Sequence, residues 1–169
     1  GLYKALSSSN CVIPVFVFDK NIIDELDKND PRITLIFDSL SYLNKKLKKL
    51  NSKILFFHGT PINVFKDLIK KYPIEKVVFN HDYEPYGVER DINIIQFLKS
   101  NKIEVKTYKD QVIFEKNDVV KGDGTPYKVY TPYSKKWIEK YENQENSYYP
   151  SDKLLNNFKS PITFINPNL

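Results

Sequence analysis

The chain has 169 residues, of which 41% are apolar, 14% aromatic and 28% charged, a composition typical of one soluble globular domain. A single cysteine, Cys11, excludes a disulfide framework, and the formal charge of +5 permits contact with nucleic acid without requiring it. No apolar stretch approaches the roughly 20 residues of a membrane span, and no signal peptide opens the chain. We therefore expect a cytoplasmic protein with no membrane partner.

The amino terminus is unusual because the chain contains no methionine and begins at Gly1. We expect a processed or truncated chain whose first residues form the end of a helix. The element that precedes this helix is expected to be missing.

Short apolar runs then alternate with amphipathic stretches. Cys11–Phe18 is rich in β-branched and aromatic residues and predicts a strand buried on both faces. Asp30 and Pro31 are typical of an N-cap and the first residue of a helix. The apolar spacing of that helix predicts these inward positions: Ile33, Ile36, Phe37, Leu40, Leu43, Leu47 and Leu50.

The same alternation repeats as far as Tyr108. Strands are predicted at Ile54–Phe57, Val77–Phe79 and Ile103–Tyr108, and helices after Thr60 and over Gly87–Lys99. The inward positions expected in the two helices are Val64, Phe65, Leu68 and Ile69 in the first, and Val88, Ile92, Ile95 and Leu98 in the second.

The pattern weakens after Tyr108. Val112 and Phe114 predict at most a short strand, and Ser134–Tyr141 predicts a short helix around Trp137. From Asn143 to Leu169 the chain is a linker or a segment that packs along the surface.

Alternating strands and helices predict an α/β fold of the Rossmann-like, doubly wound kind, a mostly parallel sheet with helices on both faces. Ligands of such sheets bind outside the carboxyl ends of the strands. The segments expected there are Asp19 onward, His58–Thr60 and Asn80–Glu84.

Conventional catalytic motifs are absent, including the glycine-rich nucleotide loops and the zinc-protease motif. His58 and His81, with Asp82 and Glu84, allow a metal site, but hydrogen bonding within the loops is the favoured interpretation. Cys11 has no basic neighbour in sequence and is interpreted as a structural thiol.

Two runs carry more information. Asp82–Asp91 places carboxylates, Pro85, Gly87 and Arg90 between a strand and a helix, which favours a ligand loop and a local arginine–carboxylate network about equally. Asp123–Trp137 interleaves aromatic, basic and proline residues. Such a run suits interdomain packing or stacking on single-stranded nucleic acid, and its prolines favour packing.

Both runs resemble motifs of the DNA photolyase and cryptochrome family, in its amino-terminal α/β domain. Asn80–Asp91 is similar to the family's N-x-D-x-E-P-Y-x-x-x-R-D motif, and Asp123–Tyr133 to its D-G-x-P-Y-x-V-Y-T-P-Y segment. Val12–Asp19 and Asp30–Arg32 fit the family's second strand and the start of its next helix. The family's opening strand, which should precede Leu2, is not present.

The resemblance implies an antenna domain over residues 1–141 and a linker over 142–169 towards an absent helical domain. That domain would bind FAD and DNA and would repair cyclobutane pyrimidine dimers under blue light, so the present chain alone should be inactive. In members with a deazaflavin or flavin antenna, the resemblance assigns the chromophore to Asp19, Arg32, Asp82, Glu84 and Arg90.

Alternatives remain open at this point. Tyr86 and Gly87 stand where the folate-binding branch has an Asn-Glu pair, so folate is less favoured than a flavin-type antenna or an empty site. A cryptochrome-like blue-light receptor and a stand-alone nucleotide-binding or metal-dependent α/β enzyme are the other hypotheses.

Overall fold

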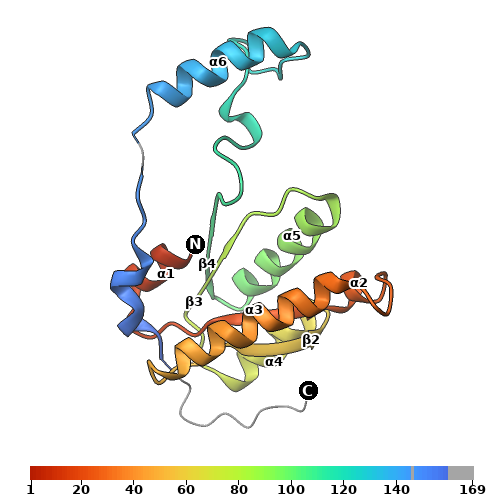
Figure 1. Ribbon diagram of the computed structural model, residues 1–169, viewed down its shortest axis with the longest axis vertical. Helices are drawn as coiled ribbons and strands as arrows, with labels where there is room; N and C mark the ends of the chain where they lie inside the picture. The colour runs from red at the N-terminus through yellow and green to blue at the C-terminus, as the bar shows by residue number, and fades with distance from the viewer. Residues whose placement is uncertain (146, 160–169) are drawn as a thin grey trace.

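The computed structural model describes residues 1–145 and 147–159 (Figure 1). The predicted strands and helices occur in the predicted order, with one short helix added directly after the first strand, where the sequence predicts none. The strands are β1 (Val15–Asp19), β2 (Leu55–Gly59), β3 (Lys76–Asn80) and β4 (Glu104–Tyr108). The α-helices are α1 (Leu2–Ser8), α2 (Lys20–Ile23), α3 (Pro31–Lys48), α4 (Pro61–Lys71), α5 (Pro85–Ser100) and α6 (Tyr130–Glu142). Two 3₁₀ helices follow the last strand, η1 (Lys116–Asp118) and η2 (Ser151–Asn157).

The sheet is split into two parallel pairs. β1 pairs with β2 from Val15 opposite Leu55 onward, and β3 pairs with β4 from Lys76 opposite Glu104 onward. No Cα atom of β1 lies within 8 Å of a Cα atom of β3. Neighbouring strands lie about 4.8 Å apart, so the two pairs are separated by more than one strand spacing. The sheet therefore has an opening between β1 and β3.

The backbone groups that border the opening have no partner strand. In a parallel ladder, successive residues direct their N–H and C=O groups to opposite sides. Because the Leu55 N–H donates to the Pro14 C=O at 2.9 Å, Val17 directs its own groups away from β2. The same alternation leaves Val78 of β3 directed away from β4. The two free edges therefore face the same opening.

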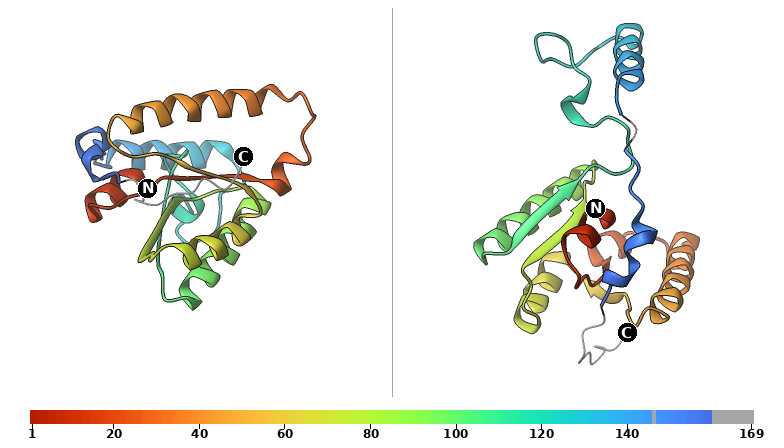
Figure 2. Two further views of the ribbon diagram at one scale, coloured as in Figure 1. Left: turned by 90° about the horizontal axis from the view of Figure 1, so that it is seen from below. Right: turned by 90° about the vertical axis from the view of Figure 1, so that its left-hand side faces the viewer.

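The helices lie in two layers. Figure 2 shows α3 on one face of the strands and α4 and α5 together on the other. The core under α4 and α5 contains Ile94, Leu98 and Ile103, with exposed fractions of 7% or less. α4 begins at Pro61, directly after Thr60, as the sequence predicts.

Three predictions about the first strand are corrected. β1 begins at Val15 rather than at Cys11, because Pro14 has no N–H for a ladder and the chain at Val12 instead forms an isolated bridge with Phe158. The strand is partly rather than fully buried on its faces. Cys11 is exposed, so it is not a buried structural thiol.

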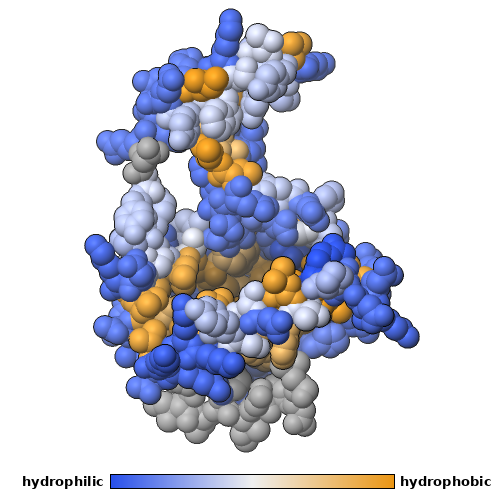
Figure 3. Space-filling view, in the orientation of Figure 1, coloured by the Kyte–Doolittle hydropathy of each residue, from blue (hydrophilic) through white to orange (hydrophobic). Residues whose placement is uncertain are grey.

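The predicted inward faces of two helices are also corrected. No residue of α3 is buried, and the side chains of Phe37 and Leu43 are 56% and 48% exposed. In α5, Val88 and Ile92 are exposed, and the buried stripe is Gly87, Ile94 and Leu98. The apolar residues of α5 fit two stripes on the helix, and spacing alone does not show which one packs. Figure 3 shows that apolar side chains remain on the surface, in a recessed area that borders α3.

Residues 109–145, here called the arm, extend away from the sheet (Figures 1 and 2). The short strand expected at Val112 and Phe114 is not formed, and bends lead into η1 instead. α6 begins at Tyr130, four residues before the predicted start, because Pro132 is tolerated in the first turn of a helix.

After the arm, η2 packs against α1. The Asn157 side chain donates to the Leu6 carbonyl at 2.7 Å, and Leu6 is fully buried. α1 confirms the predicted helix at the amino terminus. Residues 160–169 of the predicted tail lie outside the described residues. In the described part of the chain, no helix is long and apolar enough to cross a membrane.

Candidate functional site

Asp19 is the most buried charged residue at the carboxyl ends of the strands. It is the last residue of β1, is 6% exposed, and caps α2 by accepting from the Asn21 N–H at 3.1 Å. Its other carboxylate oxygen accepts from the Tyr86 hydroxyl at 2.6 Å. Burial and this bond to a carboxylate raise the pKa of Tyr86, so the phenol remains a donor.

Asp82 organises the loop between β3 and α5. Its Oδ1 accepts from the backbone N–H groups of Tyr83 at 2.7 Å and Glu84 at 3.3 Å, which closes an Asx turn. Its Oδ2 accepts from Arg90 at 3.3 Å, and Arg90 also donates to Asp91 at 2.9 and 2.8 Å. Burial opposes the charge on Arg90, but Asp91 and Asp82 outweigh it and raise the pKa of the guanidinium.

Gly87 allows this loop to close on α5. A Cβ atom at position 87 would lie 2.4 Å from the carboxyl carbon of Asp82, which is far inside van der Waals contact. Glycine is therefore required here by close approach rather than by backbone angle.

The two halves of the sheet meet at these residues. Tyr86 of α5 reaches across to Asp19, and the Asn21 side chain donates to the Tyr86 hydroxyl at 3.0 Å. The Arg90 guanidinium lies 5.9 Å from the centre of the Tyr86 ring. We call Asp19, Asn21, Asp82, Tyr86 and Arg90 the seam cluster.

The structure thus brings three of the five predicted site residues together, Asp19, Asp82 and Arg90. Glu84 adjoins them as the exposed N-cap residue of α5, with no side-chain cap bond. Arg32 does not join: its side chain is 69% exposed and pairs with Asp30 at 2.6 Å. That pairing is local, because Asp30 caps α3 two residues before Arg32.

Two further groups at the strand ends were missed from the sequence. The Thr60 hydroxyl, directly after β2, and the Asn80 amide oxygen, at the end of β3, are buried without a hydrogen-bond partner among the described residues. Buried polar atoms normally have a partner. Their position after strands was the available signal, since Thr60 and Asn80 fall in the segments expected at the ligand edge.

The two histidines have different surroundings. His58 is exposed, whereas His81 Nδ1 lies 2.8 Å from a carboxylate oxygen of Glu115 and Nε2 lies 2.9 Å from the Thr107 hydroxyl. His81 therefore bonds to side chains, where the sequence favoured loop backbone. Within residues 1–145 and 147–159, no group of three or more His, Cys, Asp or Glu side chains is placed to hold a metal ion.

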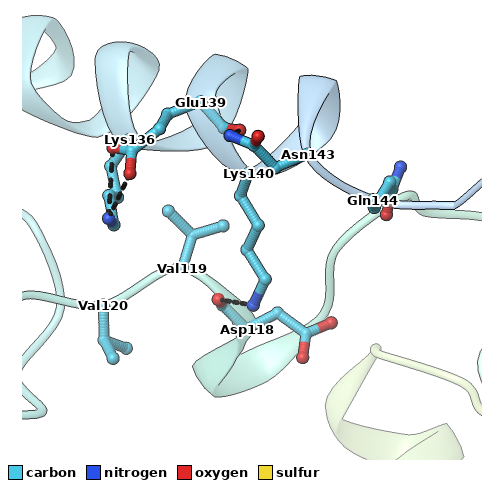
Figure 4. Close-up of a pocket in the computed structure, with 8 residues that line it drawn as sticks. All are labelled: Asp118, Val119, Val120, Lys136, Glu139, Lys140, Asn143 and Gln144. Atoms are coloured by element: carbon cyan, nitrogen blue, oxygen red, sulfur yellow. Dashed lines mark hydrogen bonds and ion pairs between the residues drawn. The ribbon is translucent and has the colours of Figure 1, made fainter.

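A shallow pocket lies elsewhere, on the arm between η1 and α6 (Figure 4). Lys140 crosses it and donates to the backbone carbonyl of Asp118, while Lys136 pairs with Glu139 at 3.0 Å along the helix. Its lining contains Asp118, Val119, Val120, Lys136, Glu139, Lys140, Asn143 and Gln144. No predicted site residue lines this pocket.

Parallel strands joined by crossover helices, with helices on both faces, define a doubly wound α/β domain, and carboxylates and an arginine lie at the carboxyl edge of its strands. The DNA photolyase family matches residues 1–151. The chain belongs to this family.

Curated relatives agree with this assignment. The chain is 30% identical over 137 residues to a deoxyribodipyrimidine photo-lyase of Synechococcus sp., covering 81% of the chain and 28% of the relative. It is 27% identical to that of Halobacterium salinarum, covering 78% and 27%. It is also 31% identical over 93 residues to cryptochrome-2 of Gallus gallus, covering 55% and 16%. The chain spans less than a third of the length of each of these relatives.

Solved structures share the fold. A bacterial class III photolyase from Agrobacterium tumefaciens superposes with a TM-score of 0.76 at 23% identity, over 99% of this chain and 33% of that one. An archaeal photolyase from Sulfolobus tokodaii, solved with two FAD molecules, gives 0.64 at 22% identity, over 96% and 39%.

Proposed function

We propose that this chain is the antenna-chromophore domain of a deoxyribodipyrimidine photolyase. The observation that carries the proposal is the family match over residues 1–151, together with photo-lyase relatives that cover about four fifths of the chain. The domain is placed at residues 1–141, and residues 142–169 are a linker towards a helical domain that binds FAD and damaged DNA. Part of this linker, η2, packs back against α1. Light-driven repair of cyclobutane pyrimidine dimers belongs to the full-length, cytoplasmic protein, and the present chain alone does not repair DNA.

The seam cluster is proposed to seat a flavin- or deazaflavin-type antenna. Its carboxylates accept hydrogen bonds, Arg90 supplies a cation and Tyr86 an aromatic ring, which suits a ring system bearing N–H and hydroxyl groups. The unpartnered Thr60 hydroxyl fits a ligand that carries a further hydrogen-bonding group. When bound, such a chromophore absorbs light and passes the excitation to FAD.

Folate is disfavoured by the geometry at Gly87. A glutamate at this position, as in the folate-binding branch, would place its Cβ against the carboxylate of Asp82. Tyr86 is held by Asp19 at 2.6 Å and fills the neighbouring position. The loop is therefore built for a different set of contacts.

Blue-light repair of irradiated DNA by the full-length protein tests the activity. We expect cyclobutane dimers to be split into intact pyrimidines under light and to remain unrepaired in darkness. A protein that binds FAD but repairs neither dimers nor other photoproducts would overturn the photolyase assignment in favour of a cryptochrome-like receptor. Substrate turnover by the isolated chain would instead support a stand-alone α/β enzyme.

The absorption spectrum of the full-length protein tests the antenna. We expect a second chromophore band beyond FAD, and loss of that band with retained FAD in Asp82→Asn and Arg90→Gln. Arg32→Gln is the matched control, because Arg32 lies outside the seam cluster, and should keep the band. A wild-type protein with FAD alone would mean that the antenna site is empty.

A further inference from the structure

A second polar network connects the sheet to the arm. Glu115 Oε2 lies 2.8 Å from His81 Nδ1 and accepts from the Tyr83 hydroxyl at 2.8 Å. His81 Nε2 lies 2.9 Å from the hydroxyl of Thr107 in β4. The side chains of His81 and Glu115 are only 22% and 16% exposed, so the contacts are largely shielded from water. The family match does not assign a role to these residues.

Both ring nitrogens of His81 have a partner in one tautomer of the imidazole. Nδ1–H then donates to Glu115, and Nε2 accepts from the Thr107 hydroxyl. Burial opposes the charge of Glu115, but the bonds from His81 and Tyr83 outweigh it and lower its pKa. The charged groups nearest to this carboxylate on the arm are Lys116 and Asp118.

Glu115 also fixes the start of η1 in the arm. It is the N-cap of η1, and its backbone N–H donates to the Asp118 carboxylate at 2.9 Å. Lys116, the next residue, has a φ of 47°, a left-handed conformation that costs a non-glycine residue about 1 kcal/mol or more. The surrounding contacts must hold this conformation in place.

The rest of the arm depends on this point. Phe114 packs edge-on against Trp137 of α6, with ring centres 5.3 Å apart. In the described part of the chain, no Cα atom of α6 lies within 8 Å of a Cα atom of another helix or strand. The direction of α6 is therefore set through Phe114, Glu115 and η1 rather than by packing on the sheet.

The loop that holds Glu115 is the loop that carries Asp82. His81 and Tyr83 are the chain neighbours of Asp82, and they bond to the arm while Asp82 bonds to Arg90. The loop thus has one side on the seam cluster and the other side on the arm. A displacement of Asp82 must move both of its neighbours.

We propose that His81, Tyr83 and Glu115 form a clamp that positions the arm and links its orientation to the state of the seam cluster. The three are positioning residues, since they hold the arm and the Asp82 loop together. The link to an occupied seam cluster rests on the proposed function, whereas the clamp itself does not. Coupling of this kind is reciprocal, so an arm held in place favours the loop geometry that the seam cluster needs.

Hydrogen exchange of the Glu115 and Asp118 amides in the present chain tests the clamp, because both amides donate hydrogen bonds at the start of η1. Glu115→Gln keeps the shape of the side chain but removes its charge and one acceptor, so we expect exchange to accelerate roughly tenfold or more. Glu142→Gln, on the exposed surface of α6, is the matched control and should leave the rates unchanged. Unchanged rates in a folded Glu115→Gln variant would overturn the clamp.

The pH dependence of this hydrogen exchange distinguishes loss of the clamp from a general loss of structure. Because the pKa of Glu115 is lowered below its ordinary 4.5, the clamp should be intact above that pH. Its protection should then disappear as the pH falls through the lower pKa of the folded chain. Glu115→Gln should abolish this pH dependence of exchange at the amides of residues 115 and 118. A profile that is the same in the variant would contradict the role of Glu115.

Asp82→Asn tests the link between the two sites. Exchange of the Glu115 and Asp118 amides should accelerate a fewfold, less than in Glu115→Gln. Asp30→Asn, which breaks an unrelated pair, should have no effect. No change in Asp82→Asn would refute the link. These measurements need no chromophore, so a full-length protein without an antenna band would refute the antenna and leave the clamp standing.

Discussion

The two faces of the sheet carry amphipathic helices, but the apolar side chains of these helices are buried to different extents on the two faces. Under α4 and α5, Val64, Leu68 and Leu98 are 6% or less exposed. On the other face, α3 has no buried residue, and Phe37 remains 56% exposed. We attribute the difference to the opening between β1 and β3, because an interrupted sheet offers less surface on which a helix can pack. An amphipathic pattern therefore predicts a helix, but burial requires a continuous sheet beneath it.

Truncation of one apolar side chain on each face gives the largest expected contrast. Leu98→Ala should lower the free energy of unfolding by about 2–5 kcal/mol, because it leaves a cavity in a closed core. Phe37→Ala should cost less than about 1 kcal/mol, since the ring is already half in water. Urea denaturation measures both. Equal losses would show that the α3 face is as well packed as the other.

Gly87→Ala tests the seam where the two halves meet. The added Cβ would overlap the carboxyl group of Asp82, so we expect a loss of about 1–3 kcal/mol in the free energy of unfolding. Gly122→Ala is the matched control, because nothing lies within 4 Å of a Cβ at that position. Thermal unfolding measures both variants. A loss in Gly87→Ala as small as in Gly122→Ala would mean that the Asp82 loop can move aside at little cost.

The order of elements was predictable because strands and helices of this fold have local signatures. The Pro31 and Pro61 helix starts lie where the sequence places them, since N-caps and first-turn prolines depend only on neighbouring residues. The inward face of α5 was not predictable, because its residues form two apolar stripes. The predicted burial of one face of α3 was wrong for a non-local reason, because the sheet beneath this helix has an opening.

The same distinction applies to the site. Asp82, Gly87 and Arg90 lie within one short segment, so their meeting follows from a strand, a turn and one helical turn. The bond between Tyr86 and Asp19 joins residues 67 positions apart, and no spacing in the sequence reveals it. Arg32 was expected at the site through resemblance, but Asp30 offers it a nearer partner.

Filling the opening tests the explanation for α3. We expect an extended, β-branched segment of five or six residues, joined ahead of Gly1, to slow hydrogen exchange of the Val17 and Val78 amides up to about tenfold. Gly1 lies against the side chain of Asn80 at the end of β3, so a strand leading into Gly1 would end level with its neighbours. A glycine-serine segment of equal length is the control. Similar exchange of the Val17 and Val78 amides with either segment would mean that the opening does not explain the exposure of α3.

Tyr86→Phe removes the hydrogen bond that joins the two halves across the seam and has the smallest expected effect. The free energy of unfolding should fall by about 1 kcal/mol, because Asp19 keeps the backbone N–H of Asn21 as a donor. Tyr130→Phe, at a side chain on the surface of the arm, should leave the free energy of unfolding unchanged.

The same bond has a pH dependence, because the pKa of Tyr86 is raised in the folded chain. The contribution of Tyr86 to stability is complete below its ordinary pKa of 10 and is lost as the pH rises through the higher pKa of the folded chain. The free energy of unfolding of Tyr86→Phe should therefore fall less steeply with rising alkaline pH than that of the wild type. An unchanged alkaline profile would show that the halves are held together without this bond.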